Sequence, residues 1–240
     1  MATPLVDKSP DRIAGMFDAI APRYDLLNRV LSAGIDQRWR ARAVRSLALT
    51  GRETLVDVCA GTADVALEAV GAGPHGAARA IGVDFAGAML VLGLRKVVAR
   101  GVRDRVTLVR GDAMRLPLAT GSADAATIAF GIRNVADAAA GCDELARVVR
   151  PGGRLAILEF GVPRVPGLGA LYQWYFSAVL PRLGRLISGH SAAYSYLPAS
   201  VGSFTPPAEF AKMLERAGFV EVRADPLTFG IVYLYSARRG

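Results

Sequence analysis

Three aspartates in the first half of the chain each stand at the end of a short apolar run, where their carboxylates could bind one ligand. Asp57 could accept hydrogen bonds from an ammonium group, Asp84 from the hydroxyls of a ribose, and Asp112 from an adenine amino group. A single aspartate in such a place is more often a helix cap or a turn residue. The ordered set is a stronger signal than any of its members, and it indicates a nucleoside with a free sugar edge.

The turn after the first apolar run indicates which nucleoside. Cys59–Ala63 reads CAGTA, so Gly61 is its one glycine, whereas a dinucleotide-binding turn has the pattern G-x-G-x-x-G. One glycine lets the backbone approach a ligand closely but does not build a cradle for a pyrophosphate. A ligand with a cationic tail and no phosphates fits better, so these residues favour S-adenosylmethionine over NAD.

A sheet must bring these residues together, and the hydropathy pattern predicts one. Strand-like apolar runs alternate with helical patterns, which favours right-handed crossovers and a parallel sheet covered on both faces. The runs are almost continuously apolar, as in strands buried on both faces. The predicted strands are Thr54–Val58, Arg79–Asp84, Val106–Arg110, Asp124–Phe130 and Arg154–Phe160, and the helices between them are Ala63–Val70, Gly87–Arg100 and Asp137–Val149.

The last part of the chain predicts that one strand is reversed. Val220–Ala224 and Phe229–Ala237 read as strands separated by a short connection around Asp225-Pro226. No crossover helix fits there, so the two strands must be antiparallel. We therefore expect an α/β fold with a seven-stranded sheet, mostly parallel with one antiparallel strand. The other segments are predicted as amphipathic helix over 12–48, an aromatic-rich stretch over Leu168–Ile187, a polar loop over Ser188–Thr205 and a helix over Pro206–Ala217.

Six stretches carry a resemblance to a known family, which runs in order from about Met16 to Arg238. They read MFDAIAPRYDLLNRVLSAGIDQRWR, VDVCAGTADVA, FGIRNVAD, VVRPGGRLAILEF, LYQWYFSAVLPRLGRLIS and YSYLPASV. In these stretches the chain resembles the ubiquinone/menaquinone biosynthesis C-methyltransferases, which include the demethylmenaquinone methyltransferases. FGIRNV and VLPRLG are specific to that family, whereas the glycine turn and RPGG are shared by class I methyltransferases generally.

The resemblance implies a class I S-adenosylmethionine-dependent methyltransferase (Rossmann-like) fold in one domain, 1–240. The implied reaction is transfer of a methyl group from S-adenosylmethionine to a ring carbon of a prenylated quinol, with demethylmenaquinol as the expected acceptor. A benzoquinol of the ubiquinone pathway, or another small aromatic or lipid acceptor, is the alternative. The expected parts are an N-terminal helical cap (1–50), a cofactor-binding core (51–160), a substrate- or membrane-facing insert (161–205) and a C-terminal helix and strands that close the sheet (206–240).

The family's cofactor-binding positions correspond in this chain to Thr62, Asp84 and the pair Asp112-Ala113. Two positions depart from the family pattern. Ala63 stands where glycine is usual, so the turn must accept a β-carbon, and Ala129 stands where serine is frequent, which removes a hydroxyl near the cofactor. The expected cofactor-binding residues are therefore Asp57, Gly61, Thr62, Asp84, Asp112 and Ala113.

Methylation of a ring carbon requires electron density in the ring, and removal of a proton from an adjacent hydroxyl supplies it. A quinol hydroxyl resembles that of tyrosine, with a pKa of about 10, so it needs a base or a stabilising cation. Arg133, after the fourth predicted strand, could stabilise a quinolate oxygen or hold a water that takes the proton. The resemblance points to Asn134 for orienting the substrate and to Tyr24, with Asp25, for covering the site. Arg133 could instead cap a helix or pair with Asp137, and Tyr24 could be ordinary packing.

The remaining candidates for chemistry are weaker. His75 lies in a connection between a helix and a strand and His190 in the predicted loop. Either could be a general base in principle, but both rank below Arg133 as the residue that activates the acceptor. The two histidines and the two cysteines, Cys59 and Cys142, are dispersed without metal-ligand spacing, so no metal site is expected. An S-adenosylmethionine fold that has lost its activity is a further alternative.

The composition fits one α/β domain and a polyanionic partner. The chain has 240 residues, of which 52% are hydrophobic, a net charge of +8 and a pI near 10.0. Dispersed arginines without a Lys/Arg block argue against nucleic acid. The aromatic and arginine-containing stretch Leu168–Ile187 suits the membrane interface, and its alternative is burial against the sheet or in a homodimer interface. Few cysteines, no secretory signal and no long apolar run predict a cytoplasmic protein with peripheral contact at the inner face of the membrane.

Overall fold

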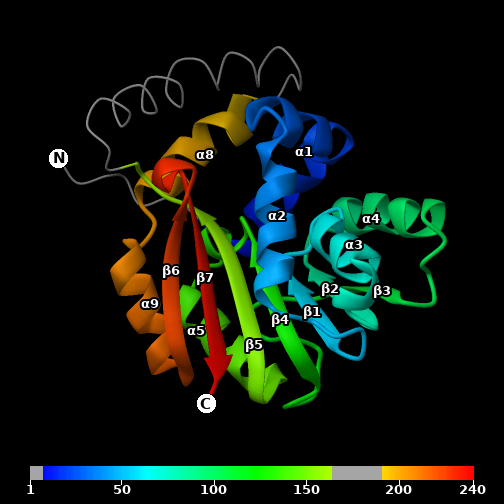
Figure 1. The fold of residues 1–240 in the computed structure, drawn as a ribbon. Helices are drawn as coiled ribbons and strands as arrows, with labels where there is room; N and C mark the ends of the chain where they lie inside the picture. Colours follow the sequence, from blue (N-terminus) through cyan, green and yellow to red (C-terminus); the bar gives the residue numbers. More distant parts are fainter. Residues whose placement is uncertain (1–7, 164–190) are drawn as a thin grey trace.

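Seven strands form one sheet: β1 (Thr54–Val58), β2 (Arg79–Asp84), β3 (Val106–Arg110), β4 (Ala123–Ala129), β5 (Val149–Phe160), β6 (Phe219–Leu227) and β7 (Val232–Arg239). The computed structural model describes residues 8–163 and 191–240. The strand order is β3-β2-β1-β4-β5-β7-β6 (Figure 1). β1 to β5 are parallel, and β7 is antiparallel to both of its neighbours. The predicted sheet, mostly parallel with one reversed strand, is therefore confirmed.

Helices cover both faces of the sheet and its upper edge. They are α1 (Pro10–Leu31), α2 (Ile35–Ser46), α3 (Asp64–Gly71), α4 (Gly87–Ala99), α5 (Ala138–Val148), α8 (Ser191–Gly202) and α9 (Pro207–Arg216). The side chains of β1 alternate between two cores. Val56 and Val58 pack with α5 and α9 on one face, and Leu55 packs with α2 and α3 on the other. No helix in the described ranges is long and apolar enough to cross a membrane.

α1 and α8 lie above the carboxyl ends of the parallel strands, at the top of Figure 1. They share a third apolar cluster, in which Ile20 and Leu27 of α1 pack with Met89 of α4 and Val201 of α8. The predicted helix over 12–48 is two helices, because the chain turns at Ala33 and Gly34, which have φ of +51° and +77°. These helices cover the edge of the sheet where a ligand would bind.

The prediction of a polar loop over Ser188–Thr205 is wrong where the structure describes this segment. Residues 191–202 form α8, even though Pro198 lies inside the helix. A proline removes one backbone hydrogen bond, so sequence alone favours a break. Here tertiary contacts offset that loss, since Tyr196, Ser200 and Val201 are buried against the rest of the molecule. The aromatic-rich stretch Leu168–Ile187 lies outside the described residues.

The connection between the last two strands also differs from its prediction. Asp225 and Pro226 belong to β6, where they pair with Leu234 and Tyr233 of β7. The turn comes later, in a 3-10 helix at Thr228–Gly230. β6 is an edge strand, and an edge strand tolerates a proline because it need not donate to a neighbour.

Candidate active site

The site is centred between β1 and β4, where the strand order reverses and where open parallel sheets bind ligands. The residue after each strand has a left-handed backbone: Cys59 has a φ of +55° and Phe130 a φ of +60°. This conformation costs a residue with a β-carbon about 1–2 kcal/mol, and such strain is found mainly at functional sites. The two turns direct the chain away from the sheet and leave space above its edge.

A cavity of about 110 Å³, here called the donor cavity, occupies that space. Four of the six predicted cofactor residues line it, namely Gly61, Asp84, Asp112 and Ala113. The other two, Asp57 and Thr62, line a small adjoining pocket of about 30 Å³ together with Gly61. The six predicted residues therefore lie close together, but they line two adjoining spaces and not one.

The hydrogen bonds of the turn explain why it does not suit a pyrophosphate. The amide of Gly61 donates to Asp84 Oδ2 at 2.7 Å, that of Ala60 to the carbonyl of Val83 at 3.1 Å, and that of Ala63 to the carbonyl of Ala60 at 2.8 Å. Amides that a phosphate would need are thus already used, and a carboxylate stands beside them. Asp84 keeps acceptor capacity for ribose hydroxyls, since a carboxylate has about four acceptor sites. Burial raises the pKa of Asp84, and the amides that it accepts from oppose that change.

Asp57 is a buried carboxylate with one oxygen left unpaired in the part of the chain that the structure describes. Its side chain is buried, with 1% of the residue exposed, and Oδ1 accepts a hydrogen bond from Thr127 Oγ1 at 2.8 Å. Oδ2 is buried with no hydrogen-bond partner among the described residues. Burial raises the pKa of Asp57 to about 7. A buried acceptor without a donor is costly, so an ammonium group in the adjoining pocket fits this carboxylate.

Ala63, which stands where the resembled family has glycine, adopts a φ of +64° as the N-cap of α3. Its β-carbon is accommodated because α4 has a glycine at the facing position. A β-carbon built on Gly93 would lie 3.2 Å from that of Ala63 and 3.0 Å from Leu108 Cδ1. The chain therefore accommodates the β-carbon of Ala63 because Gly93, which faces it, has no side chain.

The hydroxyl of Thr62 points away from the donor cavity into a network of charges. Thr62 Oγ1 donates to Asp25 Oδ1 at 2.6 Å and accepts from Lys96 Nζ at 2.8 Å. Lys96 also pairs with Asp64 at 2.6 Å, and Arg40 pairs with the other oxygen of Asp64 at 2.9 Å. This ion-pair network joins α1, α2, α3 and α4 around the turn, so Thr62 contributes its hydroxyl to the frame of the site.

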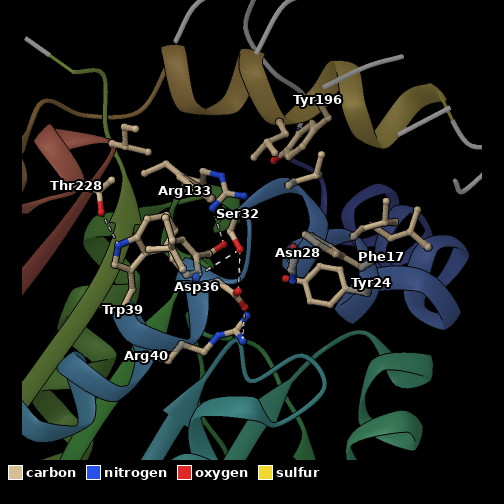
Figure 2. A pocket seen from close by; sticks show the side chains of 18 of the residues that line it. Phe17, Tyr24, Asn28, Ser32, Asp36, Trp39, Arg40, Arg133, Tyr196 and Thr228 are labelled. Carbon is tan, nitrogen blue, oxygen red and sulfur yellow. Dashed lines mark hydrogen bonds and ion pairs between the residues drawn. The ribbon is translucent and has the colours of Figure 1, made fainter. Parts of the chain in front are cut away.

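A second cavity, of about 220 Å³ and here called the acceptor cavity, is lined by side chains of α1, α2 and α8 (Figure 2). Its walls are mainly apolar, with aromatic rings from Trp39 and Phe160. Phe17, Tyr24 and Phe130 line both the acceptor cavity and the donor cavity. The two cavities therefore share a wall of three aromatic side chains.

Arg133 lines the acceptor cavity from the 3-10 helix Ile132–Asn134, and it is 5% exposed. Nη1 donates to Glu159 Oε1 at 2.7 Å and to the carbonyl of Phe130 at 2.6 Å, and Nε donates to Ser200 Oγ at 3.4 Å. Within the described part of the chain Nη2 has no partner. Arg133 thus forms a buried ion pair with the fully buried Glu159, rather than pairing with Asp137, and has two N–H groups left for a ligand.

Asn134, the next residue, lines the donor cavity instead. Its side-chain amide donates to the carbonyl of Phe130 at 3.4 Å and accepts from the hydroxyl of Tyr196 at 3.1 Å. Tyr196 and Ser200 lie one turn apart on α8, so this helix fixes both Asn134 and Arg133. Arg133 and Asn134 therefore line two different cavities, and a side chain of α8 holds each of them in place.

Tyr24 lines both cavities and the small pocket between them. Burial raises the pKa of its phenol, and a hydrogen bond with Asn28 opposes that change. The ring of Phe17 packs edge-on against Tyr24 with centroids 6.0 Å apart. Tyr24 therefore borders all three spaces, and its covering role stays a prediction.

Several residues of the site were not predicted. Lys8 lines the donor cavity, and burial lowers the pKa of its ammonium group, with Glu159 acting in the opposite direction. No signal in the sequence marks Lys8. Glu159 ends an apolar strand as Asp57 and Asp84 do, so the same reasoning could have found it. His75, by contrast, is exposed, and His190 lies outside the described residues.

Comparison with known proteins gives a consistent answer. Residues 5–239 match the model of the ubiE/COQ5 methyltransferase family. The chain is 50% identical to the ubiquinone/menaquinone biosynthesis C-methyltransferase UbiE of Syntrophotalea carbinolica, over 93% of this chain and 92% of that protein. It is 46% identical to the demethylmenaquinone methyltransferase of Thermus thermophilus, over 93% of this chain and the whole of that protein.

Solved structures share the fold at low sequence identity. An S-adenosylmethionine-dependent methyltransferase of Thermotoga maritima superposes with a TM-score of 0.63 at 17% identity, covering 94% of this chain and 99% of that one. A phosphoethanolamine N-methyltransferase of Haemonchus contortus superposes with a TM-score of 0.62 at 14% identity, covering 84% of this chain and 52% of that one. These likenesses confirm the class I methyltransferase fold.

Proposed function

The chain belongs to the ubiE/COQ5 methyltransferase family, and from this premise we propose that the donor cavity binds S-adenosylmethionine and the acceptor cavity binds demethylmenaquinol. The protein is an S-adenosylmethionine-dependent C-methyltransferase of quinone biosynthesis. Demethylmenaquinone methyltransferase is the name of relatives from Thermus thermophilus and Deinococcus radiodurans. The observation that carries the proposal is the aromatic wall that the two cavities share.

The residues of the donor cavity suit each part of this donor. Asp84 would hold the ribose hydroxyls, and Asp112 with Ala113 would hold the adenine. Asp57 would accept from the ammonium group in the small pocket, with its unpaired Oδ2. When bound, the donor supplies a methyl group on a sulfonium, which is already a good electrophile. The chain's own task is therefore to position and activate the acceptor ring.

Arg133 is the residue that we assign to activation of the ring. Glu159 fixes the guanidinium in one orientation, and the two N–H groups of Nη2 can donate to a quinolate oxygen. Donors held in place before the reaction stabilise developing charge without reorganisation, and loss of one such donor typically lowers turnover by 10²–10³-fold. Because an arginine does not itself lose a proton, it acts here as an electrostatic stabiliser.

We assign positioning roles to Asn134 and Tyr24. Asn134 is held by Tyr196 and lies on the donor side, where its amide can orient the ring edge that receives the methyl group. Tyr24 stands in the shared wall and excludes water from the place where the two ligands meet. Holding the reacting atoms in line contributes much of the remaining rate enhancement.

We propose that the protein contacts the membrane peripherally when it takes up its substrate. Withdrawing a prenyl chain from lipid costs about 0.8 kcal/mol for each exposed methylene, so docking at the bilayer would be favourable. The net charge of +8 suits anionic lipid. The segment that we expect to dock, within the insert 161–205, is largely outside the described residues. Co-flotation with vesicles that contain anionic lipid, and not with neutral vesicles, is the expected result.

The test of the proposed function is a methyl-transfer assay with labelled S-adenosylmethionine and reduced demethylmenaquinone. Label should enter the naphthoquinol, and a benzoquinol of the ubiquinone pathway, added as a competitor, should be methylated more slowly. The matched variant Asp84→Asn keeps the size of the side chain and should weaken binding of S-adenosylhomocysteine by calorimetry. No labelled product with either acceptor would contradict the proposal, and unchanged affinity of the Asp84 variant would contradict the ribose assignment.

A further inference from the structure

A carboxylate in the wall of the acceptor cavity has no role in the function proposed above. Asp36 lies on α2 and lines the acceptor cavity together with Ser32 and Arg40 (Figure 2). Its side chain is only 7% exposed, in a cavity that is otherwise mostly apolar. A charged group is costly to bury in such surroundings unless its partners compensate for the lost water. The contacts of Asp36 therefore show what remains available to a ligand.

Those contacts use only part of the carboxylate. Oδ1 accepts from Ser32 Oγ at 2.7 Å, and Oδ2 pairs with Arg40 Nη1 at 2.9 Å. The same nitrogen of Arg40 is shared with Asp64, also at 2.9 Å. A carboxylate has about four acceptor sites and no hydrogen to donate. Two sites thus remain on Asp36, and the shared cation compensates only part of its charge.

Among the polar side chains that line the acceptor cavity, Arg133 and Asp36 differ in what they offer to a ring. Arg133 offers hydrogen-bond donors from the turn after β4, and Asp36 offers acceptors from α2. The indole N–H of Trp39 is already used, because it donates to Thr228 Oγ1 at 2.9 Å. A quinol has hydroxyl groups on opposite sides of its ring. The oxygen next to the methylated carbon becomes negative and requires a donor, whereas the other hydroxyl keeps its hydrogen and requires an acceptor.

We propose that Asp36 selects the reduced form of the acceptor by accepting a hydrogen bond from the hydroxyl that does not react. This inference rests on the proposed function, since it assigns a role within the same acceptor cavity. An oxidised quinone has a carbonyl oxygen at that position, which cannot donate and is repelled by a carboxylate. Only the reduced form has a hydroxyl whose proton can be removed to activate the ring. Asp36 therefore disfavours binding of the unreactive form, and it acts as a residue that determines specificity.

Equilibrium binding of the two redox forms tests this role without turnover. The probe is a naphthoquinone with one short prenyl chain, used oxidised and, after chemical reduction under nitrogen, as the quinol. Binding to protein saturated with S-adenosylhomocysteine is followed by quenching of Trp39, in a Trp174→Phe background that removes the only other tryptophan. Hydrogen bonds to charged groups correspond to about ten- to hundredfold in affinity. The quinol should bind at least tenfold more tightly than the quinone.

Asp36→Asn should reduce that preference at least tenfold, because an amide can donate to the quinone carbonyl. Asp64→Asn is the matched control: it removes the other partner of Arg40 and leaves Asp36 in place, so the preference should remain. A preference in the Asp36 variant within twofold of the parent overturns the inference. If that variant does not fold, the parent protein and a quinol methylated on its unreactive hydroxyl oxygen give the answer. This ligand should bind about tenfold more weakly than the quinol, and equal binding also overturns the inference.

The result is separable from the proposed function. A parent protein that methylates the quinol but shows no Asp36-dependent preference contradicts the inference alone. A parent protein that binds neither redox form and transfers no methyl group contradicts the proposed function. A hundredfold fall in kcat of the Asp36 variant, with unchanged binding of both forms, would instead make Asp36 the proton acceptor and overturn the selection role.

Discussion

At the scale of single residues, Arg133 combines a structural contact with the chemical role that we propose for it. Its Nη1 neutralises a glutamate that is fully buried, while Nη2 is the group that we propose donates to the substrate. Removing one partner of a buried ion pair typically costs 3–5 kcal/mol, because the other charge is left uncompensated. A substitution to alanine would therefore confuse loss of fold with loss of catalysis.

We predict that Arg133→Lys keeps most of the stability but lowers turnover about a hundredfold. A lysine can still pair with Glu159, but its single ammonium group has no second nitrogen to donate to the quinolate oxygen. Denaturant unfolding, kcat and the affinity for S-adenosylhomocysteine should be measured on the same preparations. Arg133→Ala is the comparison, and it should lose about 3–5 kcal/mol of stability. Parental turnover in the lysine variant would contradict the assigned role.

Asp57 makes a prediction about pH. Its pKa is about 7 in the folded protein, above the usual value of 3.8, so between these values the native state holds a proton that the unfolded state has lost. Stability contributed by this group is present at low pH and falls as pH rises towards 7. Each pH unit in that window corresponds to about 1.4 kcal/mol. We therefore predict that the free energy of unfolding of Asp57→Asn, relative to that of the parent, rises by about 3 kcal/mol from pH 5 to pH 8 when no ligand is bound. Denaturant unfolding measures both free energies. If they change with pH in parallel, the pKa of Asp57 is not raised.

The sequence could locate many of these residues but not their partners. Asp84 and Asp112 were found because Asp84 ends β2 and Asp112 follows β3, and the carboxyl ends of parallel strands meet at one edge of the sheet. The pair of Arg133 with Glu159 joins two strand ends that are far apart in the sequence, and no local pattern encodes it. Thr62 was placed in the correct turn, but the direction of its hydroxyl depends on Asp25 in α1.

At the scale of elements, the start of α3 depends on two small residues from different helices. Ala63→Gly should stabilise the protein by up to about 1 kcal/mol, since glycine removes a left-handed strain of about 1–2 kcal/mol and adds chain entropy worth about 0.5–1 kcal/mol. Gly93→Ala should destabilise it, because the new β-carbon would crowd Ala63 and Leu108. The double variant should be less destabilised than the sum of the singles predicts. Strict additivity in thermal unfolding would contradict the proposed contact.

Helices and strands that depend on local sequence could be predicted, whereas those that depend on contacts with distant residues could not. β1, β2 and β3 have the predicted bounds, because buried parallel strands read as continuous apolar runs between turns. α8 and the end of β6 were not predictable. Pro198 and Pro226 indicate breaks locally, and burial against the site in one case and an edge position in the other override that signal.

At the scale of the whole molecule, the ion-pair network links the covering helices to the cofactor turn. Lys96 contacts Asp25 of α1, Asp64 of α3 and the hydroxyl of Thr62. We predict that Lys96→Met leaves two carboxylates without this cation and loosens α1. Hydrogen exchange should become faster in Pro10–Leu31, and the affinity for S-adenosylhomocysteine should fall. Arg95→Met, one residue away on the exposed side of α4, is the control and should change neither. Unaltered hydrogen exchange in α1 of the Lys96 variant would show that apolar packing alone holds this helix in place.

The position of α1 over the carboxyl edge also matters while the chain is being made. Ile20 and Leu27 emerge early from the ribosome, yet two of the side chains that bury them, Met89 and Val201, are translated much later. Translation adds about 5–20 residues per second, so the apolar face of α1 stays exposed to solvent for on the order of ten seconds. During synthesis α1 thus presents an apolar surface to which a chaperone could bind until its later partners are made.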